Sequence, residues 1–567
     1  MATYRINVAD RQYKEYEIVD SSTSIPAEGL HVGPVQSKLF NQDIFTLEKG
    51  IVTIVHSTIR AMQSIPAILA LEDNKTFGKT KKGRTLYRCI PDDRRFPEFL
   101  VPYTIKLAFS KKMYNKYVVF KFRHWDEKHP RGELMNVLGD VCILGHFYEY
   151  QLYCKSLYAS IQQFTKVTMR ALKSKSETYF IDTIMDTYNI EDRRTWDIIT
   201  IDPQGSKDFD DAFSVTNVGE NVMLSVYISN VSLWLDAMGI WDSFSQRIAT
   251  IYLPDRKRPM LPTILSDALC SLQEKRTRFA FTMDVTINSK TGKIISNTYK
   301  NTSIIVKHNL RYDTAKMKKN KIYIKALKLV NALNENYKYM ENIRSSHDVI
   351  AYIMILMNYL TAKEMVKRKI GIYRSVKGNK NFTPPENVPN NIAKFLKMWN
   401  SFGGNYVMFE NIESHDILDF DAYIHITSPI RRLIDLLNIM VFQNAVGLFA
   451  FNEKSKRFYD KWTEEDQFEY INKTMRSIRK VQNDCHLLKM CSTRKKLLDE
   501  EQEGFIFDKI KREDALYQYM IYLPVLKMVN RCTSRYEKIN HTLQKCKVFI
   551  FTDENRLKQK IRVELVE

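Results

Sequence analysis

The chain has 567 residues, which is too long for one ordinary domain. Its 44% of hydrophobic residues are enough to form the cores of about three to four domains. Its 86 lysines and arginines against 65 aspartates and glutamates leave a formal charge of +21, which favours nucleic acid or an acidic membrane surface as partner. Eight scattered cysteines without a C-x-x-C pair argue against a disulfide framework and a thiolate zinc site. The plain alternative for the charge is a surface of solvated lysines.

The start of the chain and its apolar stretches bear on location. The first residues include Arg5, Asp10 and Lys14 and no continuous apolar run, so they predict no signal peptide. The longest uncharged apolar stretch, residues 349–362, contains Asn358 and is shorter than the ~20 residues that cross a bilayer. We therefore expect a buried helix there, no membrane partner, and a cytoplasmic location with a nuclear one left open.

The first part of the chain, to about residue 160, shows the alternating character of short β-strands between polar turns. In one such run Val118, Phe120 and Phe122 would face one side of a strand, and Lys121 and Arg123 the other. Small β-barrels that bind single nucleic-acid strands combine cations and aromatic rings in this way. A β domain whose surface is merely basic is the alternative.

The rest of the chain changes its pattern several times. Helical periodicity begins near residue 150, strands and loops alternate over residues 197–320, and helical periodicity dominates residues 325–450. A highly charged helix is expected at about residues 460–500, and short strands return after residue 503. The order predicts β domains at both ends of a mixed central domain.

Four aspartates directly follow the apolar, strand-like residues 198–201, and Pro203 and Gly205 between them predict a turn. They are Asp202, Asp208, Asp210 and Asp211. Carboxylates that converge in a pocket repel, and a hard divalent cation with oxygen ligands keeps them ionised. Magnesium fits best because it keeps open positions for water and phosphate, and the spacing is not that of an EF-hand. A solvated acidic turn is the plain alternative.

A second candidate site is a pair of arginines near residue 430. Thr427 or Ser428 can cap a helix there, and the proline that follows suits its first turn. Arg431 and Arg432 would then lie at the positive end of the helix dipole, where cations are unfavourable unless an anion binds. A phosphate is the expected anion and Arg431 its first contact. The alternative is that both arginines pair with acids such as Asp435.

These segments resemble signature blocks of the ribonuclease II superfamily, which includes ribonuclease R and the catalytic subunit of the exosome. The family's D-P, four spacer residues and D-x-D-D-A stands at residues 202–212. Its Y-L-P … P-M-L-P … L-S … L-C-S-L block is similar to residues 252–272, and its H-F-T-S-P-I-R-R-Y-x-D block to residues 425–437. The blocks follow the family's order, so the chain is identified as a member; the exosome subunit's endonuclease domain has no counterpart.

The resemblance implies a multidomain α+β fold, in which a central mixed α/β RNB nuclease domain is flanked by OB-type β-barrels. Residues 1–74 would form a degenerate first cold-shock barrel and residues 75–160 a second one. Residues 161–490 would form the RNB catalytic domain, and residues 500–567 a C-terminal OB-type RNA-binding domain.

The resemblance also implies an activity, which is 3′-5′ hydrolysis of single-stranded RNA to nucleoside 5′-monophosphates by two Mg²⁺ ions about 4 Å apart, with Mn²⁺ as a substitute. The four aspartates would bind metal, with Asp210 the residue most needed for chemistry, and Arg431 would contact the phosphate. Tyr252 and Tyr312 would meet the RNA bases and Arg432 the backbone. The alternative for both tyrosines is a place in the core.

The chain departs from the family at two places. The family's H-I-A-D-V-S has Tyr227 for its histidine and Asn230 for its aspartate, and its E-E-x-M-L-L-A-N begins with Ala351 and Tyr352. The missing acidic residue bears on recognition of the terminal nucleotide. Two rival hypotheses therefore stay open: a catalytically inactive RNA-binding scaffold with the RNB fold, and a basic adaptor that acts through protein contacts. Neither would release mononucleotides.

Overall fold

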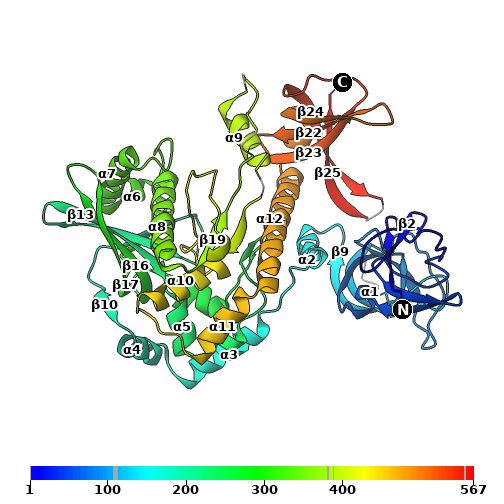
Figure 1. Cartoon of the computed structure of the whole chain (residues 1–567), viewed down its shortest axis with the longest axis horizontal. Helices are drawn as coiled ribbons and strands as arrows, with labels where there is room; N and C mark the ends of the chain where they lie inside the picture. The colour runs from blue at the N-terminus through cyan, green and yellow to red at the C-terminus, as the bar shows by residue number, and fades with distance from the viewer. Residues whose placement is uncertain are drawn as a thin grey trace. The chain divides into compact units, whose positions relative to one another are not determined.

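The computed structural model describes residues 2–105, 113–379, 382–386, 388–401, 403–554 and 557–566. The chain divides into two compact units, which we describe separately. The first unit comprises residues 1–158, 253–255 and 479–567, and the second comprises residues 159–252 and 256–478. The fold is multidomain α+β with an OB-type barrel, as predicted (Figure 1).

The chain begins with an antiparallel sheet of strand order β2-β1-β3-β4. Its strands are β1 (Tyr4–Val8), β2 (Tyr16–Asp20), β3 (Ile44–Glu48) and β4 (Ile51–His56), and the short helix α1 (Thr58–Ala61) follows. Ile6, Leu39 and Phe45 are fully buried beneath it. In the part of the chain that the structure describes, this sheet stays open, whereas the sequence predicted a degenerate barrel.

A closed barrel of order β5-β6-β7-β9-β8 comes next. Its strands are β5 (Ile65–Leu69), β6 (Leu86–Pro91), β7 (Phe99–Pro102), β8 (Lys116–His124) and β9 (Arg131–Asp140). The barrel begins at Ile65, inside the range 1–74 that was predicted for the first barrel. Val118 and Phe120 point into its core as predicted, but Tyr117 on the other face of β8 is also buried. The reason is α2 (Leu144–Cys154), whose Tyr150 ring stacks on Tyr117 with centroids 4.3 Å apart.

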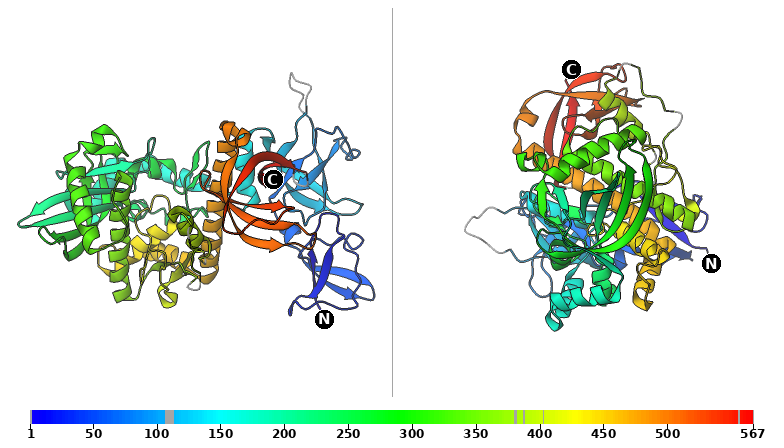
Figure 2. Two further views of the ribbon diagram at one scale, coloured as in Figure 1. Left: turned by 90° about the horizontal axis from the view of Figure 1, so that it is seen from above. Right: turned by 90° about the vertical axis from the view of Figure 1, so that its left-hand side faces the viewer.

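The last strands form a curved five-stranded sheet of order β23-β22-β21-β24-β25 (Figure 2). They are β21 (Gln502–Lys511), β22 (Tyr517–Leu523), β23 (Met528–Ser534), β24 (Leu543–Asp553) and β25 (Lys558–Leu565), preceded by α12 (Glu465–Thr493) and α13 (Lys496–Asp499). Lys558 of β25 pairs with Asp92, at the end of β6, with Nζ 2.6 Å from Oδ1. The terminal sheet and the closed barrel therefore share one compact unit.

The second unit is built on a seven-stranded sheet of order β10-β17-β16-β13-β12-β11-β18. The outer pairs β10·β17 and β11·β18 are parallel and the others antiparallel. The strands are β10 (Ile190–Arg193), β11 (Ile199–Asp202), β12 (Asp211–Val218), β13 (Asn221–Ser229), β16 (Thr277–Asn288), β17 (Ile294–Ile305) and β18 (His308–Arg311). This mixed sheet carries the predicted aspartates at the end of β11 and the start of β12.

Helices α7 and α8 cover one face of this sheet (Figure 1). Phe281, Met283 and Val285 of β16 belong to one apolar core with these helices, α5 belongs to a second core, and α10 contributes to both. The helices of the unit are α3 (Gln162–Ser174), α4 (Glu177–Thr187), α5 (Val231–Ala237), α6 (Ala315–Lys318), α7 (Lys321–Asn336), α8 (Ser346–Arg368), α9 (Asn390–Trp399), α10 (Leu433–Ala445) and α11 (Glu453–Thr463). Two short antiparallel strand pairs complete it, the hairpin of β14 (Ile251–Tyr252) with β15 (Lys257–Arg258), and β19 (Ile372–Ser375) with β20 (Asn405–Met408).

Helix α8 contains the apolar stretch of residues 349–362. Among the described helices it is the one long and apolar enough to cross a membrane, but 56% of its most apolar window is buried within the protein. Ile353, Leu356 and Met357 are fully buried in the core against the sheet. The prediction of a buried core helix is therefore confirmed.

Candidate active site

The loop between β11 and β12 is held in place by the segment that the second sequence block contributes. The backbone N–H of Phe209 donates to Ser271 Oγ (3.0 Å), and that hydroxyl donates to the carbonyl of Lys207 (2.7 Å). The N–H of Leu272 donates in turn to the carbonyl of Phe209 (3.0 Å). The turn that precedes Asp210 is therefore fixed by contacts some sixty residues further along the chain.

Asp210 joins the acidic loop to the third sequence block. Its side chain is 3% exposed, Oδ1 accepts the N–H of Ile430 (2.9 Å), and Oδ2 lies 3.1 Å from Arg431 Nε. Burial raises the pKa of Asp210 to about 8, and the charge of Arg431 only partly opposes this. A buried carboxylate with so high a pKa is typical of functional sites.

Asp202 and Asp211 interact with each other near Asp210. Burial and then the charge of Asp211 raise the pKa of Asp202 to about 8, and burial raises the pKa of Asp211 to about 6 against the opposing charge of Arg431. Among the described residues, the buried Oδ2 atom of Asp202 has no hydrogen-bond partner. Closely spaced carboxylates with an unsatisfied buried oxygen have the donor chemistry of a hard divalent cation site, so these residues fit the predicted metal.

Asp208 lies in a different environment. Its Oδ1 is 2.9 Å from Lys257 Nζ, and its Oδ2 accepts the hydroxyl of Tyr252 (3.0 Å). In the described part of the chain, no group of three or more acidic, histidine or cysteine side chains is close enough to hold a metal ion as it stands. The four-aspartate ligand set of the sequence analysis thus remains a prediction, and Asp208 and Asp210 are each already paired with a cation.

The helix after the arginine pair begins later than predicted. Arg432, not Thr427 or Ser428, is the N-cap of α10, and no side chain caps the helix. The reason is non-local, because an isolated bridge to Ala249 holds Arg432 extended while the N–H of Ser428 donates to Asp435 Oδ1 (2.8 Å). The first residues of the segment are therefore not helical.

The two arginines have different roles. Arg432 donates to buried Asp435 (2.8 Å), as the alternative reading expected, and is a structural pair. Arg431 contacts Asp210 while its side chain stays 45% exposed. Only Arg431 therefore combines a contact to the acidic cluster with a surface that an incoming phosphate could reach.

The two predicted tyrosines lie beside the acidic cluster and are only partly buried. Tyr252 donates to Asp208, and burial followed by the charge of Asp208 raises its pKa. Tyr312 donates its backbone N–H to the carbonyl of Asp202 (3.2 Å), and its ring stacks on His347 with centroids 3.7 Å apart. Neither is a plain core residue.

Sequence reasoning missed three residues of this region: Lys257, Asp267 and His347. Asp267 is a single acid in an apolar stretch, which is a signal that could have found it, whereas Lys257 belongs to a run of four charged residues, 255–258, and nothing in the sequence separates it from its neighbours. His347, at the start of α8, carries no comparable signal, since its stacking on Tyr312 depends on the fold.

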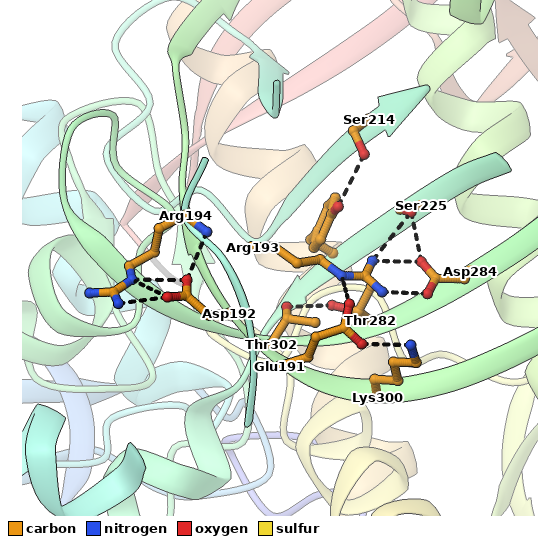
Figure 3. A network of polar contacts seen from close by, with 11 residues as sticks. Glu191, Asp192, Arg193, Arg194, Ser214, Ser225, Thr282, Asp284, Lys300 and Thr302 are labelled. Atoms are coloured by element: carbon orange, nitrogen blue, oxygen red, sulfur yellow. Dashed lines mark hydrogen bonds and ion pairs between the residues drawn. The ribbon is translucent and has the colours of Figure 1, made fainter. Parts of the chain in front are cut away.

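The residues that replace family positions are buried. The hydroxyl of Tyr227 contacts Ser214 (3.0 Å) on the sheet face opposite the α7–α8 core. Ser214 is one of the residues labelled in the polar network of Figure 3. The amide of Asn230 donates to Asn301 (2.9 Å) and Gln443 (3.0 Å), within a fully buried cluster of neutral side chains. These replacements change the interior of the unit, not the acidic cluster.

The acidic residue that the family has near Ala351 and Tyr352 is replaced by core packing. Tyr352 is fully buried and donates its hydroxyl to the carbonyl of Tyr337 (2.9 Å). Its neighbour Ala351 has no polar side chain. The exposed group that the structure provides at this end of α8 is His347.

Two protein families match the chain, and both matches agree with the fold. The family described as RNB domain matches residues 190–344, which include the four aspartates and both tyrosines. The family described as Dis3-like cold-shock domain 2 matches residues 86–142, within the closed barrel. Arg431 lies beyond the matched range, and it joins the site through Asp210.

The chain is also similar to individual proteins. Ribonuclease R of Mycoplasmopsis pulmonis is 34% identical over 169 residues, which are 29% of this chain and 23% of that protein. The chain thus matches less than a quarter of the length of this curated relative. Two solved structures share the fold: Mycoplasma genitalium RNase R in complex with ribose methylated single-stranded RNA (TM-score 0.70, 16% identity, all of both chains) and yeast Ssd1, a pseudonuclease (TM-score 0.60, 12% identity, 94% of this chain and 78% of that one).

Proposed function

We propose that this chain, which belongs to the RNB-type exoribonuclease superfamily, shortens single-stranded RNA from its 3′ end and releases nucleoside 5′-monophosphates. One observation carries the proposal. Buried Asp210 and the partly buried Asp202 and Asp211 form a mutually repelling cluster beside the exposed guanidinium of Arg431, inside and next to the matched RNB domain.

RNB nucleases generally depend on a divalent metal, and we propose Mg²⁺, two ions, with Mn²⁺ as a substitute. Asp202, Asp208, Asp210 and Asp211 would hold them. When bound, the ions would supply an activated water and stabilise the leaving 3′ oxygen of the phosphodiester. The raised pKa values of Asp202 and Asp210 support this assignment, because a cation is what would return both carboxylates to the ionised form.

The chain's own side chains would then bind and orient the RNA. Arg431 would donate to the scissile phosphate, and its Nε contact to Asp210 would hold the guanidinium in position. Tyr252 and Tyr312 would stack on the terminal bases, and Arg432, held by Asp435, would support the segment that presents Arg431. Asp210, anchored by the N–H of Ile430, would orient the attacking water.

The proposal is tested with single-stranded RNA that carries a 5′ label, incubated with the full chain and Mg²⁺ or EDTA. We expect a ladder that shortens from the 3′ end, a short residual oligonucleotide and free mononucleotides, all dependent on Mg²⁺. A 3′-phosphate or a blunt duplex should resist. Mononucleotides released from the 5′ end, or internal cuts, would contradict the proposal.

A second candidate function is RNA binding without hydrolysis. The observation that favours it is that Asp208 is already paired with Lys257, and that no three potential ligands among the described residues are assembled for a metal ion. In the same assay this candidate predicts RNA that is retained at full length with and without Mg²⁺, while a gel shift reports binding.

A further inference from the structure

Lys257 lies between two carboxylates at the edge of the acidic loop. Its Nζ atom is 2.9 Å from Asp208 Oδ1 and 2.8 Å from Asp267 Oδ1. The other oxygen of Asp208 accepts the hydroxyl of Tyr252 (3.0 Å). Both oxygens of this predicted metal ligand are therefore engaged, one of them by a full positive charge.

The surrounding elements hold this arrangement. Tyr252 and Lys257 are direct cross-strand partners in the β14·β15 hairpin, so both reach Asp208 from the same hairpin. Asp267 lies in a short π-helix, Leu265–Leu269, where the hydroxyl of Ser266 also donates to its Oδ1 (2.6 Å). Asp267 is thus fixed independently of Asp208.

The charge on Lys257 is maintained in this position. Its ammonium lies between two carboxylates, at 2.9 Å from Asp208 and 2.8 Å from Asp267, and both favour the charged form. Each oxygen of Asp208 keeps a further lone pair, so the ammonium does not block a metal ion outright, but two cations at one carboxylate repel each other. Lys257 therefore competes electrostatically with a metal ion at Asp208.

We propose that Lys257 is a resident cation that competes with a divalent metal ion for Asp208, and that Asp267 is the positioning residue that retains the ammonium when the metal ion takes Asp208. The inference rests on the proposed function, because it concerns the same aspartate cluster. In this scheme Lys257 neutralises Asp208 while no metal ion is bound. When a metal ion binds Asp208, Asp267 holds the displaced ammonium of Lys257.

The scheme makes two variants act in opposite directions. Lys257→Met frees Asp208, so metal should bind more tightly. Asp267→Asn leaves Lys257 with Asp208 as its only carboxylate partner in this trio, so metal should bind more weakly. A merely structural role for either residue would weaken binding in both variants. Lys257→Arg keeps a cation at the position and should restore behaviour close to that of the unaltered chain.

The measurement is isothermal titration of Mn²⁺ into the full chain without RNA, with thermal unfolding recorded for each variant. Groups that support metal ligands commonly change affinity by about 10–100-fold. We expect Kd to fall by about tenfold in Lys257→Met and to rise by about tenfold in Asp267→Asn. The control is Lys456→Met, which removes the same charge from an exposed pair with Asp460 in the same unit and should leave Kd within about twofold.

The inference is overturned if Lys257→Met binds Mn²⁺ no more tightly than the unaltered chain, or if Asp267→Asn binds it no more weakly. Should Lys257→Met fail to fold, Asp267→Asn and Lys257→Arg still decide the matter, because neither removes the lysine's positive charge. Failure of the proposed function is a separate result: unaltered chain that binds Mn²⁺ but degrades no RNA. A chain that binds no Mn²⁺ at all would overturn both.

Discussion

Two clusters of charge lie in the same unit, and they differ in how their charges are balanced. In the first, Arg193 is 1% exposed, donates to both oxygens of Asp284 (2.6 and 2.7 Å), and donates through Nε to Glu191 (2.7 Å), as Figure 3 shows. In the second, Asp202, Asp210 and Asp211 gather around one arginine, Arg431.

The pKa directions of the two clusters are opposite. Although burial acts against it, the pKa of Glu191 is lowered by hydrogen bonds from Arg193 and Lys300. The pKa values of Asp202 and Asp210 are raised, chiefly by burial, because one arginine does not compensate three carboxylates. A balanced cluster supports the fold, whereas an unbalanced one needs a cation from outside. Charge balance therefore separates structural from functional acidic residues better than burial does.

The largest expected effect comes from removing one charge of the unbalanced cluster. Asp210→Asn should lower the rate of mononucleotide release by roughly 10³-fold or more, since a group oriented at the reacting atoms is lost. Its side-chain oxygen can still accept the N–H of Ile430, and Arg431 remains, so folding and RNA affinity should be nearly unchanged. The measurement is release of labelled mononucleotides together with a gel shift. A variant that hydrolyses RNA at nearly the original rate would show that this cluster is not the active site.

Breaking the balanced cluster around Arg193 should lower the stability of the fold. Asp284→Asn leaves the buried guanidinium of Arg193 without its main counter-charge, which should lower the free energy of unfolding by about 3–5 kcal/mol. The matched control is Asp192→Asn, which breaks an exposed pair with Arg194 and should cost less than about 1 kcal/mol. Urea unfolding measures both. Equal effects of the two variants would contradict the structural role assigned to this network.

The smallest expected effect is a dependence of stability on pH. Because folding raises the pKa of Asp202 from its ordinary 3.8 to about 8, the folded chain binds more protons than the unfolded chain over this interval. The contribution of Asp202 is therefore present at low pH and is lost as pH rises towards 8.

Without metal, the unaltered chain should thus lose stability relative to Asp202→Asn by at least ~1 kcal/mol, the equivalent of one pKa unit, between pH 5 and about pH 8. Saturating Mg²⁺ should reverse the loss. Unfolding curves at several pH values, with Mg²⁺ or EDTA, provide the comparison. If the stability difference between the unaltered chain and Asp202→Asn does not change with pH, folding does not raise the pKa of Asp202.

Much of this organisation could be predicted from the sequence, because the signals were local. The apolar run before Asp202 predicted the strand, and the position of Pro203 and Gly205 predicted the turn that follows. The buried helix at residues 349–362 followed from its composition, and α8 confirms it. The RNB family and the α+β fold were recognised from the order of three short blocks.

What the sequence could not predict depends on contacts between distant segments. The start of α10 is set by the bridge from Arg432 to Ala249, about 180 residues earlier, which no local capping rule contains. The burial of Tyr117 depends on the helix that covers the outside of its strand. The pairing of Lys257 with Asp208 needs two loops to meet, so its charge suggested only a basic surface.

The pair formed by Asp92 and Lys558 joins two residues that are synthesised far apart in time. The two residues are 466 positions apart, and both side chains are largely shielded from solvent. A ribosome adds about 5–20 residues per second, so the ammonium emerges roughly 20–90 s after the carboxylate. During that interval Asp92, which follows β6 of the closed barrel, lacks its ion pair with Lys558. Translation that stops before β25 should therefore yield an imperfect early barrel, and such truncated products should be preferred substrates for cellular proteases.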